Sequence, residues 1–172
     1  MGAMQQALDH PRLVPSLIVG VSLSALGIAW ASEVWGGLLP CVLCIYQRYA
    51  FFAAFAFGLA GVALGGRPPL RRITVVLAGL AFLTGAAIAF FHVGVEQHWW
   101  RGTAGCHAPV FDPNASVEQM REQLLGTRFV PCDEIPWSLF GLSMAGYNFL
   151  TSLGLALASL WAARRITVDQ GT

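Results

Sequence analysis

The chain has 172 residues, of which 56% are hydrophobic and 11% are charged, and its mean hydropathy is +0.61. This length predicts a single domain over 1–172, and the composition is typical of a polytopic membrane protein. The net charge is only +1, and the ten basic residues do not form one patch. A basic patch for nucleic acid is thereby excluded, and we expect no nucleic-acid partner.

Four apolar stretches approach the roughly 20 residues that a helix needs to cross a bilayer. They lie at about 14–31, 44–64, 73–91 and 139–163, and Arg48 is the one charged residue within them. Because irregular backbone cannot face lipid, each stretch should be helical. The sequence predicts an all-α membrane protein, a four-transmembrane-helix bundle with two outer loops at about 32–43 and 92–138.

The charges differ between the two sets of helix ends. One set carries six arginines and two acids: Arg12, Arg67, Arg71, Arg72, Arg164 and Arg165, with Asp9 and Asp169. The other set carries seven acids and four arginines. The positive-inside rule predicts that both termini are cytoplasmic and that all four cysteines lie outside, where disulfides persist.

The first stretch admits a second interpretation. Ala29-Trp30-Ala31 fits a small-x-small signal-peptide cleavage site after an apolar core. Cleavage there would leave three helices, with the cysteines still outside. A membrane span is favoured, because the run fills a bilayer and few positive charges precede it.

A C-x-x-C pair, Cys41 and Cys44, opens the second stretch, and Pro40 interrupts any helix before it. The helix dipole and free N–H groups stabilise a thiolate at a helix N-terminus, and C-x-x-C spacing lowers the thiol pKa further. Arg48 follows Cys44 by four residues and therefore shares its helix face. A charge so near hydrocarbon is usually functional. The pattern favours a redox-active dithiol.

Two further cysteines, Cys106 and Cys132, lie in the long polar segment at 92–138. Zinc sites place cysteines two to four residues apart, whereas 25 residues separate these two, so we expect no metal. Haem attachment requires a histidine directly after C-x-x-C, and Ile45 stands there. Two inert structural disulfides remain an alternative, although they would need neither the helix-end placement nor the nearby arginine.

The redox interpretation requires a terminal electron acceptor, because disulfides of ordinary stability are weak oxidants. At the edge of a membrane, the natural acceptor is a lipid-soluble quinone. Arg48 and His92 are the candidate cofactor-binding residues, since His92 ends the third stretch at the level of Cys44. A histidine at a helix end also often serves as an interface residue, so its role here is a hypothesis.

The sequence Pro-Cys-Val-Leu-Cys-Ile-Tyr-Gln-Arg at 40–48 resembles the signature of the DsbB-type disulfide bond formation proteins of bacterial inner membranes. Four spans, one cysteine pair in each outer loop and Phe140-Gly141-Leu142 at the start of the fourth helix also match. The resemblance covers nearly the whole chain. It implies a protein-dithiol:quinone oxidoreductase in the inner membrane, with periplasmic cysteines.

The same resemblance implies an electron path. A Cys106–Cys132 disulfide would oxidise a periplasmic DsbA-like thioredoxin-fold partner, with Cys106 forming the mixed disulfide. Cys132 would then exchange with Cys41, and Cys44 would pass electrons to ubiquinone or menaquinone.

Two positions near the pair bear on the cofactor. Arg48 matches the family arginine beside the quinone, and His92 falls near a quinone-contacting histidine. Gln47 stands where a glutamate is common, which removes a possible local counter-charge for the arginine.

Three other interpretations remain. One is a paralogue of the same fold with a dedicated thiol partner, and another is a structural four-span protein with two static disulfides. A vitamin-K-epoxide-reductase-like enzyme would place its C-x-x-C after the long loop rather than before it.

A capping box and an apolar stripe predict a short amphipathic helix at 116–126 within that loop.

Overall fold

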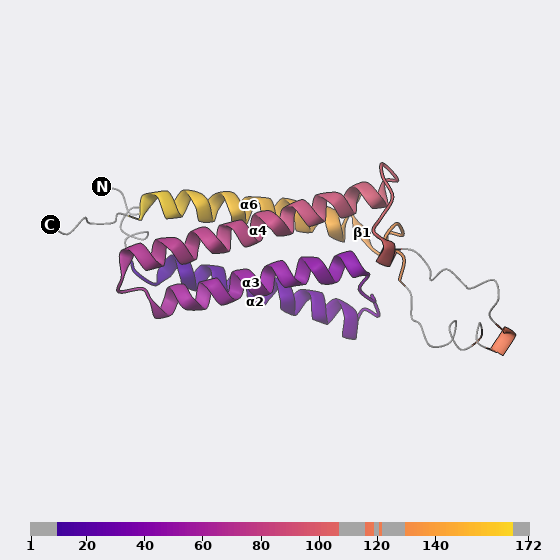
Figure 1. The fold of residues 1–172 in the computed structure, drawn as a ribbon, viewed down its shortest axis with the longest axis horizontal. Coiled ribbons are helices and arrows are strands. Elements are labelled where there is room, and N and C mark those ends of the chain that lie inside the picture. The colour runs from indigo at the N-terminus through magenta and orange to yellow at the C-terminus, as the bar shows by residue number, and fades with distance from the viewer. Residues whose placement is uncertain (1–9, 107–115, 119–120, 122–129, 167–172) are drawn as a thin grey trace.

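The computed structural model describes residues 10–106, 116–118, 121 and 130–166. Four long helices make up most of this part: α2 (Leu13–Val34), α3 (Val42–Ala63), α4 (Pro68–Glu96) and α6 (Met144–Arg165). A short 3-10 helix, η1 (Ala104–Cys106), and a hairpin of β1 (Ser138–Leu139) and β2 (Leu142–Ser143) lie between α4 and α6. Consecutive helices run antiparallel in an elongated bundle (Figure 1), which confirms the predicted all-α fold.

Residues suited to helix N-termini begin three of these helices. Cys41 precedes α3, and its sulfur accepts a hydrogen bond from the backbone N–H of Cys44. Pro68 begins α4, and its lack of a backbone N–H costs no hydrogen bond because the first N–H groups of a helix have no partner within it. Ser143 caps α6 by accepting a hydrogen bond from the N–H of Gly146 at 3.1 Å. The caps of α3 and α6 lie at the same end of the bundle (Figure 1).

The fourth helix begins at Met144, whereas the sequence predicted a start at 139. The strands β1 and β2 form a tight hairpin, and its two central residues, Phe140 and Gly141, have φ angles of 51° and 79°. A two-residue hairpin loop of this hand requires positive φ at both positions, which glycine adopts without strain. Placing Phe140-Gly141-Leu142 at the start of the helix was therefore wrong, because apolar composition does not distinguish a hairpin from a helix.

The third helix runs further than predicted, to Glu96 rather than to 91. His92 consequently lies within the last turns of α4 instead of at its end. Glu96 follows one turn later on the same face, since residues four apart are neighbours on a helix. This extension carries two buried polar side chains toward the cysteines.

Adjacent helices pack in the order α2, α3, α4 and α6. Small residues allow close approach: Gly85 of α4 lies against Ala50 of α3, and Gly79 of α4 lies against Ser159 and Leu160 of α6. Larger side chains fill the centre, where Phe51 and Phe82 meet edge to face at 5.6 Å between ring centroids.

Three of the four long helices, α2, α3 and α4, are long and apolar enough to cross a membrane. The fourth helix, α6, has the same length as α2 and α3 but carries more polar residues. Two of them, Ser152 and Ser159, are buried inside the bundle. Large apolar side chains such as Trp30 and Leu157 remain exposed on the outer surface. Most of the predicted 116–126 helix lies outside the described residues.

The cysteines and the arginine clusters lie at opposite ends of the bundle. Cys41, Cys44, Cys106 and Cys132 gather where α3 begins and α4 ends, whereas Arg67, Arg71, Arg72, Arg164 and Arg165 lie where α4 begins and α6 ends (Figure 1). The described cysteines thus lie at the end of the bundle opposite these arginines.

Candidate redox site

The dithiol Cys41–Cys44 lies at the N-terminus of α3. The two sulfurs are 2.9 Å apart, and Cys41 Sγ also accepts the backbone N–H of Cys44 at 3.3 Å. Cys41 is fully buried and Cys44 is partly exposed. Since Cys41 already accepts a backbone hydrogen bond, its sulfur is the natural acceptor for the Cys44 S–H.

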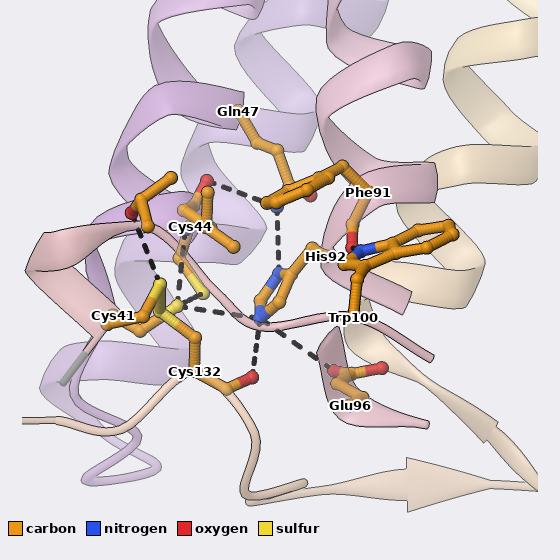
Figure 2. The surroundings of a disulfide bond; sticks show 11 residues. Cys41, Cys44, Gln47, Phe91, His92, Glu96, Trp100 and Cys132 are labelled. Carbon is orange, nitrogen blue, oxygen red and sulfur yellow. Dashed lines mark hydrogen bonds and ion pairs between the residues drawn. A yellow bond between two sulfur atoms is a disulfide. The ribbon is translucent and has the colours of Figure 1, made fainter. Parts of the chain in front are cut away.

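His92 extends from α4 between the two cysteine pairs (Figure 2). Its Nε2 lies 3.6 Å from Cys41 Sγ and 3.2 Å from the carbonyl oxygen of Cys132. The side chain is buried. One imidazole therefore contacts the dithiol and the backbone of the second pair.

The surroundings of Cys41 favour its ionised form. The hydrogen bond from the Cys44 side chain, followed by that from His92, lowers the pKa of Cys41 from 9.0 to about 4, although burial acts in the opposite direction. Hydrogen bonds to a thiolate stabilise it because they disperse its charge. The surroundings therefore favour the thiolate form of Cys41 while both thiols of the pair are reduced.

Cys106 and Cys132 form a disulfide with a Cα–Cα distance of 5.1 Å, the pairing that the resemblance implied. Cys106 belongs to η1, and both residues are buried in a cluster with Cys41, Leu43 and Val95. The described ends of the long loop therefore fold over the N-terminus of α3. All four cysteines, far apart in sequence, meet in one apolar cluster.

A cavity of about 300 Å³ opens beside the disulfide. Cys106 contributes to its wall, and the other lining residues are Val95, His98, Trp99, Trp100, Arg101, Gly102 and Asp133. Cys132 does not line this cavity and is 1% exposed. Of the two disulfide sulfurs, the Cys106 side is therefore the one beside open space.

A metal is the competing use of Cys41, Cys44 and His92, because their ligand atoms all lie within 4.8 Å of one another. Tetrahedral zinc with Zn–S bonds of about 2.3 Å would hold two sulfurs about 3.8 Å apart. The observed 2.9 Å is much closer. This spacing fits the exchange of a sulfur–sulfur bond better than it fits zinc.

Sequence reasoning missed two polar residues of this site. Glu96 is buried, accepts a hydrogen bond from Ser143 at the cap of α6, and lies 4.0 Å from His92 Nε2. Its position four residues after His92 was the available signal. Gln47, considered only as a substitution beside Arg48, is also buried and lies 3.0 Å from His92 Nδ1.

Arg48 points away from this cluster. Its Nη1 donates to Glu33 at 2.7 Å and its Nη2 donates to the carbonyl of Ala29 at 3.2 Å, both on α2. Glu33 supplies the counter-charge that Gln47 lacks. Among the described residues, no hydrogen bond or ion pair joins Arg48 to His92. The structure thus unites the four cysteines with His92, and it places Arg48 at the α2–α3 contact.

Comparison with known proteins shows similarity to disulfide bond formation proteins along most of the chain. The family model described as "Disulfide bond formation protein DsbB" matches residues 11–162. A disulfide bond formation protein B of Xanthomonas euvesicatoria pv. vesicatoria is 37% identical over 139 residues, which cover 77% of this chain and 80% of that protein. Its counterpart in Stutzerimonas stutzeri is 29% identical over 169 residues, which cover 92% and 98% of the two chains.

Proposed function

The chain belongs to the DsbB family of disulfide bond formation proteins, and we propose that it passes electrons from a periplasmic DsbA-like thioredoxin-fold protein to a membrane quinone. Family membership makes it a thiol oxidoreductase. One observation carries the finer proposal: both cysteine pairs meet at one end of a membrane bundle, with His92 in contact with each. A static structural role would not require this juxtaposition.

Electrons enter at Cys106. A partner thiolate attacks Cys106 Sγ, the Cys106–Cys132 bond breaks, and Cys132 leaves as a thiolate. The second partner thiolate then displaces Cys106, which releases the oxidised partner. The cavity beside Cys106 supports this direction, because the attacking sulfur needs space on the side opposite the breaking bond.

Internal exchange returns the loop pair to its oxidised state. The Cys132 thiolate attacks Cys41 of a Cys41–Cys44 disulfide, and Cys44 leaves as a thiolate. Cys106 then attacks Cys132, which re-forms the loop disulfide and releases the Cys41 thiolate. The low pKa of Cys41 makes it a good leaving group, because exchange is faster when the departing thiol is more acidic.

Cys44 and Arg48 fit the quinone end of the path. Cys44 is the partly exposed member of its pair, and Arg48 presents a partly exposed guanidinium from the same helix. Two of its nitrogens bond to Glu33 and Ala29, and a guanidinium has five N–H groups in all, so donors remain. Bound ubiquinone or menaquinone supplies an acceptor for two electrons and two protons. Arg48 would stabilise negative charge beside Cys44, where little water competes.

The proposed location is the bacterial inner membrane, with both termini cytoplasmic and the cysteines periplasmic. The separation of the arginine clusters from the cysteine end supports this orientation. A periplasmic site also avoids the reducing cytosol, in which disulfides do not persist.

The test is a reconstituted assay in which the purified protein, a reduced thioredoxin-fold partner and a soluble ubiquinone analogue are mixed. We expect one quinone reduced for each partner disulfide formed, with activity lost in Cys44→Ser and in Cys106→Ser. Partner oxidation that continues at full rate without quinone, under anaerobic conditions, would contradict the proposal. Equal activity of Cys44→Ser and the parent protein would also contradict it.

A further inference from the structure

A line of buried and partly buried hydrogen bonds connects α6 to His92. Ser152 Oγ donates to Asn148 Oδ1 at 3.0 Å, Asn148 Nδ2 donates to Gln47 Oε1, and Gln47 Nε2 lies 3.0 Å from His92 Nδ1. These side chains come from three helices, α6, α3 and α4. A buried network whose members are all satisfied specifies one arrangement of its donors and acceptors.

A backbone carbonyl fixes the direction of the Gln47–His92 hydrogen bond. Gln47 Nε2 also lies 3.1 Å from the carbonyl oxygen of Leu43, which can only accept. An amide oxygen in that place would set two acceptors against each other, so the nitrogen must face Leu43. The second N–H of the same amide then points at His92 Nδ1, which accepts it and carries no hydrogen.

The other ring nitrogen leads to the same assignment independently. His92 Nε2 lies 3.2 Å from the carbonyl oxygen of Cys132, which is again only an acceptor. Nε2 must therefore carry the hydrogen. The Cys41 sulfur and the Glu96 carboxylate also lie on this side, at 3.6 and 4.0 Å. Acceptors surround Nε2, whereas a donor faces Nδ1.

We propose that Gln47 is a positioning residue that holds His92 in the neutral form protonated at Nε2, so that this N–H faces both the Cys132 carbonyl and the Cys41 sulfur. The inference rests on the function proposed above and deepens it. Protonation of Nδ1 would set its N–H against the N–H of Gln47 and would break the hydrogen bond between them. His92 therefore stabilises the departing Cys41 thiolate as a donor and does not act as a base.

The identity of residue 47 decides this outcome. A glutamate would offer only acceptor oxygens when ionised, and it would draw a hydrogen onto Nδ1. An imidazolium would result, or a neutral ring with its hydrogen moved to Nδ1. The amide at 47 thus keeps Nδ1 free of a hydrogen and leaves the hydrogen on Nε2 next to Cys41, whereas a carboxylate at 47 would place a hydrogen on Nδ1.

The remaining charges near His92 are few among the described residues. Cys41 and Cys44 face it from the start of α3, and Glu96 faces it from its own helix. Two neutral residues act through these partners: Asn148 of α6 bonds to Gln47, and Ser143, the N-cap of α6, bonds to Glu96. The loop contributes a disulfide, which does not titrate.

The test is the tautomer itself, observed by NMR of protein labelled with ¹⁵N histidine in detergent micelles at neutral pH. The chain has four histidines, and the His92→Gln variant assigns the signals of the ring. We expect Nδ1 to show the shift of an unprotonated nitrogen and Nε2 that of a protonated one. A spectrum with a hydrogen on Nδ1 in the parent protein would overturn the proposal.

Gln47→Glu should abolish this pattern and place a hydrogen on Nδ1. The matched control is Gln97→Glu, the same chemical change at the exposed C-cap of α4, which should leave the His92 signals unchanged. If Gln47→Glu does not fold, Gln47→Met is the second variant. It removes the N–H that opposes a hydrogen on Nδ1, so protonation of Nδ1 should become detectable. An unchanged tautomer in a folded Gln47→Glu or Gln47→Met variant would contradict the proposal.

The spectrum needs neither quinone nor partner, so it is independent of the proposed function. A second readout connects the two: turnover of Gln47→Glu should change with pH differently from that of the parent, because its His92 gains a proton over the measured range. A purely structural role for Gln47 would lower turnover equally at every pH. That uniform loss would overturn the proposal even if quinone reduction itself were established.

Discussion

The guanidinium of Arg48 on α3 and the carboxylate of Glu33 on α2 form an ion pair, with Nη1 and Oε2 2.7 Å apart. The pair lies at the contact between two membrane-spanning helices, one turn below Cys44. Buried or half-buried cations are costly without a partner. Glu33 therefore keeps a charged arginine at this depth, and the remaining N–H groups of Arg48 stay available to a ligand.

Arg48→Ala should lower the turnover number for quinone reduction by about 100-fold, the usual loss when one donor to a developing negative charge is removed. The KM for the reduced partner should not change, because the partner's proposed entry at Cys106 involves other residues. Steady-state kinetics with each substrate titrated separately measure both effects. The turnover number of Arg48→Lys should lie between those of the parent protein and Arg48→Ala. Lysine keeps the positive charge but lacks the planar guanidinium of arginine.

Arg72→Ala, at the opposite end of the bundle, is the matched control and should behave like the parent protein. Unchanged quinone kinetics in Arg48→Ala would leave this arginine as a helix–helix anchor only.

Replacing Cys132 with Ser should trap the oxidised partner on Cys106. The free Cys106 thiolate attacks the partner disulfide and releases one partner thiolate, and no Cys132 thiol remains to displace the partner from Cys106. Non-reducing gels followed by peptide mapping identify the trapped residue. Cys106→Ser is the control and should give no adduct at 106. A partner joined to Cys41 in the Cys132→Ser variant would reverse the direction of electron flow.

The acidity of Cys41 predicts a distinctive pH profile. A thiol whose pKa is lowered is ionised above that pKa, so the thiolate of Cys41 should appear as pH rises through about 4 and stay constant through neutrality. An ordinary cysteine would ionise only near 9.0. Ultraviolet absorbance of the thiolate, measured on reduced protein with both Cys106 and Cys132 replaced by Ser, reports this titration.

The Cys41→Ser variant of that protein should lose the signal near pH 4. His92→Gln should move the midpoint upward, because one hydrogen bond to the thiolate weakens. A midpoint near 9 in the parent pair would show that the cluster does not acidify Cys41.

The sequence predicted the parts of the site that obey local rules. C-x-x-C at a helix start, apolar stretches of membrane length and the spacing of Arg48 from Cys44 each depend on neighbouring residues. Glu96 and Gln47 were missed because their roles depend on which helices are adjacent. The hairpin at 138–143 was missed because its residues are as apolar as a span, and only the positive φ angles at Phe140 and Gly141 separate the two.

Gly94→Ala should destabilise the protein by about 1–3 kcal/mol, the usual cost of overpacking. A Cβ at 94 would overlap the indole of Trp100, which cannot easily move because it stacks on Phe91 and donates a hydrogen bond to the Phe91 carbonyl. Thermal unfolding in detergent measures the change. Gly20→Ala, where a Cβ meets no atom within 4 Å, should be neutral or stabilising, and equal effects of both substitutions would refute the overlap.

Ser143 and Asn148 lie at the start of α6, and each completes a bond that begins on an earlier helix: Ser143 to Glu96, and Asn148 to Gln47. During translation, α6 follows the other three helices out of the ribosome. Until it inserts, the carboxyl of Glu96 and the amide oxygen of Gln47 lack these partners. A nascent chain that stalls after α4 therefore contains Cys41 and Cys44, but Gln47 and Glu96 beside His92 still lack their partners from the last helix. The order of synthesis thus delays assembly of the reactive centre until the last helix is in place.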